Sequence, residues 1–265
     1  MSAFRDLFPH PKPIIGVIHL PALPGYPESP GMDRVIEKAL GDLSAFEQGG
    51  VDGVLVENFS DRPFRAEANP ETIAAMTRVT RELVSASKKS VVGVEILLND
   101  PKAALGIAHA AGAAFMRTDF FVDPMEHPEF VGQMKIDPEG LMAYRKSIGA
   151  DDVLIVADIQ VKFARMMVER SLTESARLAD EHHADAIGVT GTATGDPPAV
   201  TTVEEAKRGA GDCPVLVGSG LRRENAKKLL SAADGALVGT SLKTGARVDA
   251  PKVAELVEVV RALDI

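Results

Sequence analysis

The feature that most constrains this chain is a repeated alternation of short apolar runs with segments of helical periodicity. Eight runs rich in β-branched residues end in polar residues, and each is followed by a segment whose apolar positions recur every three to four residues. This order is typical of parallel βαβ units, and continuous apolar runs suit strands covered on both faces. The predicted strands are 14–19, 53–57, 91–96, 114–118, 153–159, 186–190, 215–218 and 236–239.

The intervening segments carry signals for helix starts and ends. Apolar residues over 32–46 follow the spacing of a single buried helix face, and Gly49-Gly50 predicts the end of that helix. Asn69-Pro70 and Asp100-Pro101 each predict a start, because a capping side chain precedes a proline in the first turn. Later helices are predicted over about 138–147, 173–181, 203–208, 223–230 and 251–263.

The length and the number of alternations together favour one closed barrel. A chain of 265 residues is long enough for two average domains, yet a single (β/α)8 barrel also has about this length. No Pro/Gly/Ser-rich linker divides the chain, so we predict one α/β TIM-barrel domain over 1–265 with a short N-terminal arm over 1–12. An open doubly wound sheet is the alternative, but His19-Leu20-Pro21 follows the first strand in place of a dinucleotide-binding loop.

Composition and charge exclude several classes of protein. The hydrophobic fraction of 45% and charged fraction of 25% are typical of globular chains and exclude wholesale disorder. A net charge of −9 without a basic patch argues against nucleic-acid binding. No apolar run approaches the ~20 residues of a transmembrane helix. A lone Cys213 and the absence of an apolar signal-peptide region favour the cytoplasm, and a homo-oligomer is left open.

Functional groups in such a barrel lie at the carboxyl ends of the strands and in the loops after them. Asp158 and Lys162, four residues apart, are the first candidates for acid–base chemistry, because a nearby ammonium keeps the aspartate ionised and an enclosed lysine loses its proton more easily. A loop salt bridge is the alternative. Glu57 and His19 are further catalytic candidates, and His19 is the only histidine expected at this face. The expected substrate contacts are Asn58, Glu95, Arg117, Asp119 and Thr190.

Glycines and hydroxyl residues gather after the last three predicted strands. Many barrels bind a phosphate in the loops after strands seven and eight, where glycines let the backbone approach an anion and hydroxyls add donors. GVTGTATGDPP after strand six predicts a loop that closes on the same ligand, although ordinary turns are the alternative. The predicted phosphate-binding residues are Gly191, Thr192, Thr194, Gly218, Ser219, Gly220, Gly239, Thr240 and Ser241.

No cofactor is predicted from the sequence. Histidine spacing does not match a dedicated zinc site, while a magnesium ion held by Glu57, Glu95 or Asp158 is left open. FMN is a weaker alternative, because a flavin phosphate occupies a similar cup. His127 is expected in a loop without a functional role, and Cys213 at the opposite face is expected to be structural.

Seven segments over about residues 13–243 together resemble the BtpA/SgcQ family. They are PIIGVIHLPALPG, EQGGVDGVLVENFSDRPF, GIAHAAGAAFMR, VADIQVK, GVTGTATGDPP, PVLVGSG and ADGALVGTSLK. The resemblance implies a phosphate-binding TIM barrel in which His19, Glu57, Asn58, Asp158, Lys162 and 190–195, 218–220 and 239–243 are shared positions. The sequence departs from the family pattern at Phe163, where histidine is common, and over 123–137, which lacks an Asp-Gln-Gly pattern.

The resemblance implies less about activity. One branch of the family is named for a factor in photosystem I biogenesis, while others resemble companions of sugar-uptake and sugar-kinase systems. The first hypothesis is therefore an enzyme of a small phosphorylated metabolite, such as a sugar phosphate, acting by isomerisation, carbon–carbon bond cleavage or glycosidic-bond cleavage. The alternative is a noncatalytic assembly or regulatory factor that keeps the barrel and its anion pocket.

Overall fold

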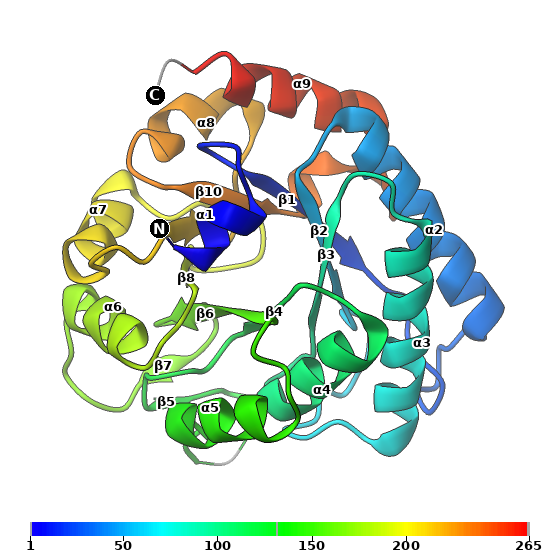
Figure 1. The fold of residues 1–265 in the computed structure, drawn as a ribbon, viewed down its shortest axis with the longest axis horizontal. Helices are drawn as coiled ribbons and strands as arrows, with labels where there is room; N and C mark the ends of the chain where they lie inside the picture. The colour runs from blue at the N-terminus through cyan, green and yellow to red at the C-terminus, as the bar shows by residue number, and fades with distance from the viewer. Residues whose placement is uncertain (1, 131, 264–265) are drawn as a thin grey trace.

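Eight parallel strands close into a barrel surrounded by helices in the computed structural model, which describes residues 2–130 and 132–263 (Figure 1). The strands follow one another around the barrel in the order β1-β10-β9-β8-β6-β4-β3-β2. They are β1 (Ile14–His19), β2 (Gly53–Glu57), β3 (Val91–Glu95), β4 (Phe115–Thr118), β6 (Leu154–Ile159), β8 (Ala186–Val189), β9 (Val215–Val217) and β10 (Gly235–Val238). The predicted fold class is confirmed, and each predicted strand boundary lies within one residue of the observed one.

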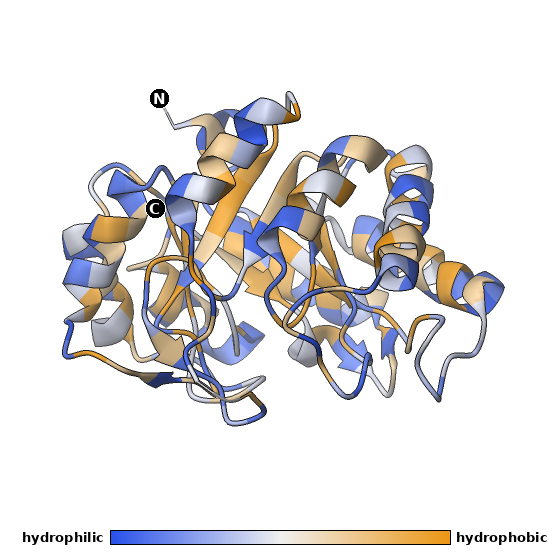
Figure 2. Ribbon diagram, turned by 90° about the horizontal axis from the view of Figure 1, so that it is seen from below, coloured by the Kyte–Doolittle hydropathy of each residue, from blue (hydrophilic) through white to orange (hydrophobic). Residues whose placement is uncertain are grey.

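Helices cover the outside of the barrel and turn their polar faces outward (Figure 2). Their starts and ends follow the local signals: Gly50 takes the left-handed conformation after the first long helix, and the Asp100 side chain accepts a hydrogen bond from Ala103 N. Asn69 makes no such capping bond. The helices are α2 (Met32–Gly49), α3 (Pro70–Ala86), α4 (Pro101–Ala111), α5 (Pro138–Ser147), α6 (Leu172–Glu181), α7 (Val200–Gly209), α8 (Arg223–Leu230) and α9 (Ala250–Arg261).

The N-terminal arm is part of the barrel core. Its short helix α1 (Ala3–Leu7) lies across the amino-terminal end of the barrel (Figure 1). Phe4 and Phe8 are each 2% exposed and pack with the side chains that fill the barrel interior. A side chain at Gly53 would lie 2.9 Å from the Phe8 ring, so glycine there makes room for Phe8. The arm therefore leaves the opposite, carboxyl end for a site.

Two small antiparallel sheets shape that carboxyl end. β5 (Met125–Glu126) pairs with β7 (Arg165–Met166) and joins the loops after β4 and β6. A short 3-10 helix, η1 (Thr240–Leu242), follows β10, and β11 (Lys243–Thr244) then pairs with β12 (Arg247–Val248). Strands of two residues have no readable periodicity, so the sequence did not indicate them. In the part of the chain that the structure describes, no helix has both the length and the apolar character of a membrane span.

Candidate active site

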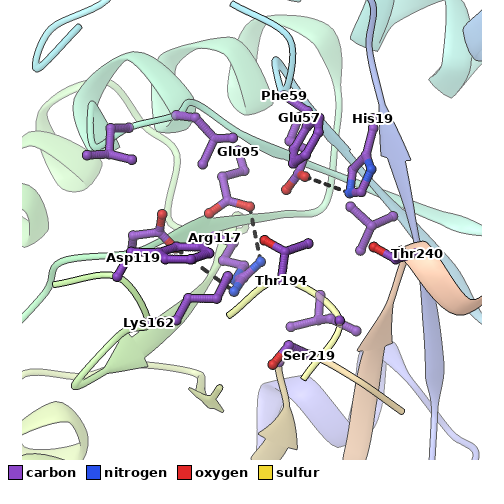
Figure 3. Close-up of a pocket in the computed structure, with 18 of the residues that line it drawn as sticks. His19, Glu57, Phe59, Glu95, Arg117, Asp119, Lys162, Thr194, Ser219 and Thr240 are labelled. Carbon is purple, nitrogen blue, oxygen red and sulfur yellow. Dashed lines mark hydrogen bonds and ion pairs between the residues drawn. The ribbon is translucent and has the colours of Figure 1, made fainter. Parts of the chain in front are cut away.

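A cavity of about 430 Å³ opens at the carboxyl end of the barrel (Figure 3). The predicted site residues that line it are His19, Glu57, Glu95, Arg117, Asp119, Lys162, Thr194, Gly218, Ser219, Gly220, Gly239, Thr240 and Ser241. The remaining predicted residues lie outside its lining, and they are Asn58, Asp158, Thr190, Gly191 and Thr192. Most of the predicted strand-end residues thus converge on one cavity, while five of the predicted residues do not line it.

His19 and Glu57 form an ion pair at the ends of β1 and β2, where the two residues are register partners. His19 Nε2 lies 2.9 Å from Glu57 Oε1, and the imidazole stacks on Phe59 with ring centroids 4.3 Å apart. Burial by itself would raise the pKa of Glu57, but the opposing charges of His19 and Arg117 lower it to about 2. Glu57 is therefore a carboxylate near neutral pH.

Lys243 holds the other nitrogen of this imidazole. Its Nζ contacts His19 Nδ1. A hydrogen bond between them requires that either Lys243 Nζ or His19 Nδ1 carries a lone pair. Burial and the nearby charge of Lys38 lower the pKa of Lys243 to about 8. Lys38 Nζ also donates to the carbonyl oxygen of His19, so the histidine is fixed through both its ring and its backbone.

Arg117, at the end of the β4 strand, lies among three buried carboxyl groups. Its Nε and Nη2 donate to the two oxygens of Asp158 at 3.0 and 2.6 Å, and Nη1 donates to Glu95 Oε2 at 3.3 Å. Asp119 Oδ1 lies 3.9 Å from Nη2. One guanidinium therefore faces three acids in a region shielded from water.

This charge imbalance favours a proton on Glu95. Burial, and then the charges of Asp119, Glu57 and Asp158, hold the pKa of Glu95 well above its usual range despite Arg117. Glu95 is 1% exposed, and its Oε1 has no hydrogen-bond partner in the part of the chain described. Glu57 and Glu95 are register partners on β2 and β3. Neighbouring carboxyl groups with pKa values pushed apart are the usual signature of a general base beside a general acid.

The predicted Asp158–Lys162 pair does not form. Asp158 is engaged by Arg117, and a side chain at Gly188 would lie 2.0 Å from its Oδ1, so glycine makes room for this pair. A four-residue spacing brings side chains together on a helix, whereas the chain turns after β6. Lys162 lies at the cavity instead, and its backbone N–H donates to Thr190 Oγ1 at 3.0 Å.

Several predicted ligand contacts join loops to one another. Ser219 Oγ accepts from Gly191 N at 2.8 Å and donates to Asp196 O at 2.7 Å, while Ser241 Oγ donates to Leu221 O at 2.7 Å. A side chain at Gly220 would lie 2.2 Å from Pro197 N.

Two more of the predicted contacts also make hydrogen bonds within the protein. Thr192 Oγ1 donates to Asp196 Oδ2 at 3.1 Å. Asn58 Oδ1 accepts from Leu97 N at 2.7 Å and so ties the loops after β2 and β3. On the glycine-rich side, Thr194, Thr240 and the backbone of 239–241 remain at the cavity.

Arg222 and His127 line the cavity but were not among the residues predicted for the site. Arg222 lines the cavity beside 218–220 and donates from Nη2 to Gly195 O at 2.7 Å, which places a cation beside the glycine-rich loops. A basic residue between a glycine-rich turn and a helix start was the available signal. The expectation that only His19 reaches this face is wrong, because His127 also lines the cavity. The irregular segment that carries it has no periodicity to read.

Metal ligands are not grouped in this part of the molecule. Within residues 2–130 and 132–263, no set of three or more His, Cys, Asp and Glu side chains is placed to hold an ion. The three carboxyl groups for which a magnesium ion was left open pair with His19 and Arg117.

Fold and cavity together define a (β/α)8 barrel with an acid–base cluster at its carboxyl end. The model of the BtpA family matches residues 10–262, and the chain belongs to this family. It is 38% identical to an uncharacterized protein of Archaeoglobus fulgidus over 94% of this chain and 99% of that protein. It is 37% identical to the photosystem I biogenesis protein BtpA of Synechocystis, covering 92% and 84%.

Solved structures with the same architecture have little sequence identity to this chain. The alpha subunit of tryptophan synthase from Legionella pneumophila superimposes with a TM-score of 0.64 at 15% identity, covering 99% of this chain and 100% of that one. Thiamine phosphate pyrophosphorylase from Pyrococcus furiosus gives 0.62 at 16% identity, covering 97% and 98%. At this identity the likeness supports the fold alone.

Proposed function

We propose that the protein is an enzyme that acts on a small phosphorylated metabolite, such as a sugar phosphate, by acid–base catalysis. The observation that carries this proposal is the pair of buried neighbouring carboxyl groups at the wall of one cavity, in which the pKa of Glu57 is lowered and the pKa of Glu95 is raised. A noncatalytic barrel does not require such a pair, since burying ionisable groups is costly. Catalysis gives this arrangement a purpose.

The two ends of the cavity divide the work. The loops after β9 and β10, together with Arg222, bind the phosphate, and this anchor orients the reacting carbons over Glu57, Glu95, His19 and Lys162. Glu95 gives its proton to a carbonyl or leaving-group oxygen, while Glu57 accepts a proton from carbon or water. Isomerisation, carbon–carbon cleavage and glycosidic cleavage all need such a donor and acceptor.

Asp158 acts through Arg117 in this scheme. It lies outside the cavity lining and binds the guanidinium with both oxygens, so it is a positioning residue. Arg117 in turn fixes Glu95.

Ligand-induced stabilisation tests the proposal first. We expect at least one compound from a panel of sugar phosphates to raise the melting temperature, because a ligand that binds the native state stabilises it. An assay is then built on that compound. Glu95→Gln and Glu57→Gln should each lower kcat by about 100-fold or more, in the range of general acid–base catalysis, with the fold retained. Unchanged kcat in both variants would reject these roles.

A second candidate function rests on the name of one relative. The photosystem I biogenesis protein BtpA is 37% identical to this chain, which favours a noncatalytic assembly factor as the alternative. If the protein is an assembly factor, no compound of the phosphate panel should change its melting temperature. It should also form a stable complex with an assembly partner, and Glu95→Gln should leave that complex intact. The catalytic proposal expects the reverse.

A further inference from the structure

The cavity has two unlike halves that face each other. In the closed barrel β9 lies opposite β3, and β8 and β10 lie opposite β2 and β4. The loops after β8, β9 and β10 carry glycines, hydroxyls and Arg222, while Phe64, Leu97 and Leu98 line the opposite side after β2 and β3, and Phe163 lines the cavity from the loop after β6. Figure 3 shows Thr194, Ser219 and Thr240 on one side and Asp119 on the other, with Glu95 and Arg117 between them. A ligand lying across this opening meets an anion site, then the acids, then an apolar wall.

Phe163 is an exposed apolar residue in the cavity lining. Its side chain is 53% exposed although it lines the cavity, and its backbone takes a φ of 66°, which is rare for a bulky residue. An exposed phenylalanine held in a strained conformation at a cavity rim indicates a surface that a ligand covers. Met167 and Val168 in the same loop are also exposed, but they do not line the cavity.

A stacked pair of planar groups, Arg62 and Phe64, is part of the cavity lining. The Arg62 guanidinium lies 3.5 Å from the centre of the Phe64 ring, and both residues line the cavity. Planar guanidinium and phenyl groups stack well against planar ligands. The hydroxyls of a sugar need hydrogen-bond partners, so such a surface suits a planar ring better than a sugar.

His127 adds a polar contact to this half. Burial lowers the pKa of His127, which favours the neutral imidazole, and its Nδ1 accepts from Glu129 N at 3.3 Å. The hydrogen of the neutral ring is then on Nε2, where it can donate to a ring nitrogen or a carbonyl oxygen.

We propose that the substrate is a nucleoside monophosphate, or a close analogue in which a planar heterocycle is joined to a phosphorylated pentose. The phosphate binds beside Arg222, the sugar lies over Glu57 and Glu95, and the heterocycle stacks against Phe163 and Phe64. A cavity of about 430 Å³ has room for the heterocycle as well as the sugar phosphate. This inference rests on the proposed function and specifies its substrate class.

Calorimetric titration of the purified protein tests it. The ligands are the four common ribonucleoside 5′-monophosphates and ribose 5-phosphate. We expect at least one monophosphate to bind roughly tenfold or more tightly than ribose 5-phosphate, which is the scale of one stacked base. Phe163→Ala should remove most of that excess and leave the affinity for ribose 5-phosphate unchanged. Met167→Ala is the matched control, an exposed apolar residue of the same loop outside the cavity, and it should leave both affinities unchanged.

Each other outcome has a distinct meaning. If ribose 5-phosphate binds and no monophosphate binds more tightly, the heterocycle subsite is wrong while the proposed function stands. If a monophosphate binds more tightly but keeps its advantage in both Phe163→Ala and Phe64→Ala, the subsite is also wrong, because the heterocycle then lies elsewhere. If none of these ligands nor any of the sugar phosphates binds, both proposals fall.

Discussion

Arg117 has one positive charge to share among Glu95, Asp119 and Asp158, all of which are buried. Its two shortest bonds go to Asp158, so the longer contact with Glu95 leaves that carboxyl undercompensated. A proton on Glu95 relieves the remaining repulsion, because burial and the charges of Asp119, Glu57 and Asp158 together outweigh Arg117 and raise its pKa. At the scale of single residues, the chemistry of the site depends on which acid Arg117 binds best.

Substitution of Asp158 by alanine tests this dependence. We expect Asp158→Ala to lower the free energy of unfolding by about 3–5 kcal/mol, because it leaves a buried guanidinium without its main partner. Urea denaturation measures the change. Glu126→Ala is the control, since it removes an exposed ion pair with Arg165 and should cost ~1 kcal/mol or less. Equal losses in the two variants would contradict the central role of Asp158.

At the scale of elements, the parallel register of β1, β2 and β3 aligns His19, Glu57 and Glu95 at one edge. Adjacent strands are about 4.8 Å apart, so side chains at register positions must interact. The pKa values of two glutamates at equivalent strand ends thereby shift in opposite directions. The imidazole of His19 lowers that of Glu57, and burial with the neighbouring acids raises that of Glu95. Strand pairing, which carries no chemistry itself, creates the acid and the base.

The two glutamates should affect the pH dependence of stability in opposite directions. The folded pKa of Glu57 is lowered from 4.5 to about 2, so its stabilising contribution is present above pH 4.5 and is lost as the pH falls through about 2. The folded pKa of Glu95 is raised, so its contribution is present below about pH 4.5 and is lost as the pH rises through the folded pKa. Urea midpoints as a function of pH measure both.

We therefore expect opposite trends in two variants. Relative to the unmodified protein, Glu95→Gln should become more stable as the pH rises from about 4.5 toward neutral. The deficit of Glu57→Gln should shrink as the pH falls from 4.5 to about 2. Parallel curves for both variants would mean that the carboxyl groups share one charge state.

At the scale of the whole molecule, the two ends of the chain close the barrel. β1 pairs with β10, α9 packs against α2, and α1 fills the amino-terminal end. Gly49 at the end of α2 allows that helix contact, since a side chain there would lie 2.2 Å from Val253 Cγ1. Closure at one end and a cavity at the other separate stability from function, as is usual in this architecture.

A pair of glycine substitutions in α2 tests this closure. Gly49→Ala should destabilise the protein by about 1–3 kcal/mol, because a stiff valine and the α9 backbone leave no room for a methyl group. Gly41→Ala should stabilise it by up to about 1 kcal/mol, since this exposed helical position meets only the end of the flexible Arg247 side chain. Thermal unfolding of both variants measures the contrast, and a stabilising Gly49→Ala would rule out tight packing of α9 on α2.

The sites that sequence reasoning found and missed differ in one physical respect. Glu57, Glu95 and Arg117 end strands, and a strand end is recognisable from local periodicity alone. Arg222 and His127 lie in loops, whose paths depend on contacts with other loops. The Asp158–Lys162 pair failed because spacing along the chain was used where pairing across strands decides.

The order of residues by itself determined the barrel, since alternating periodicities are local properties and short connections between parallel strands admit few topologies. It also determined which side chains at the strand ends reach the carboxyl end. Only the tertiary structure decided which of them are partners and which carry protons. Charge state depends on desolvation and on neighbours a few ångströms away, and residues distant in the chain supply both.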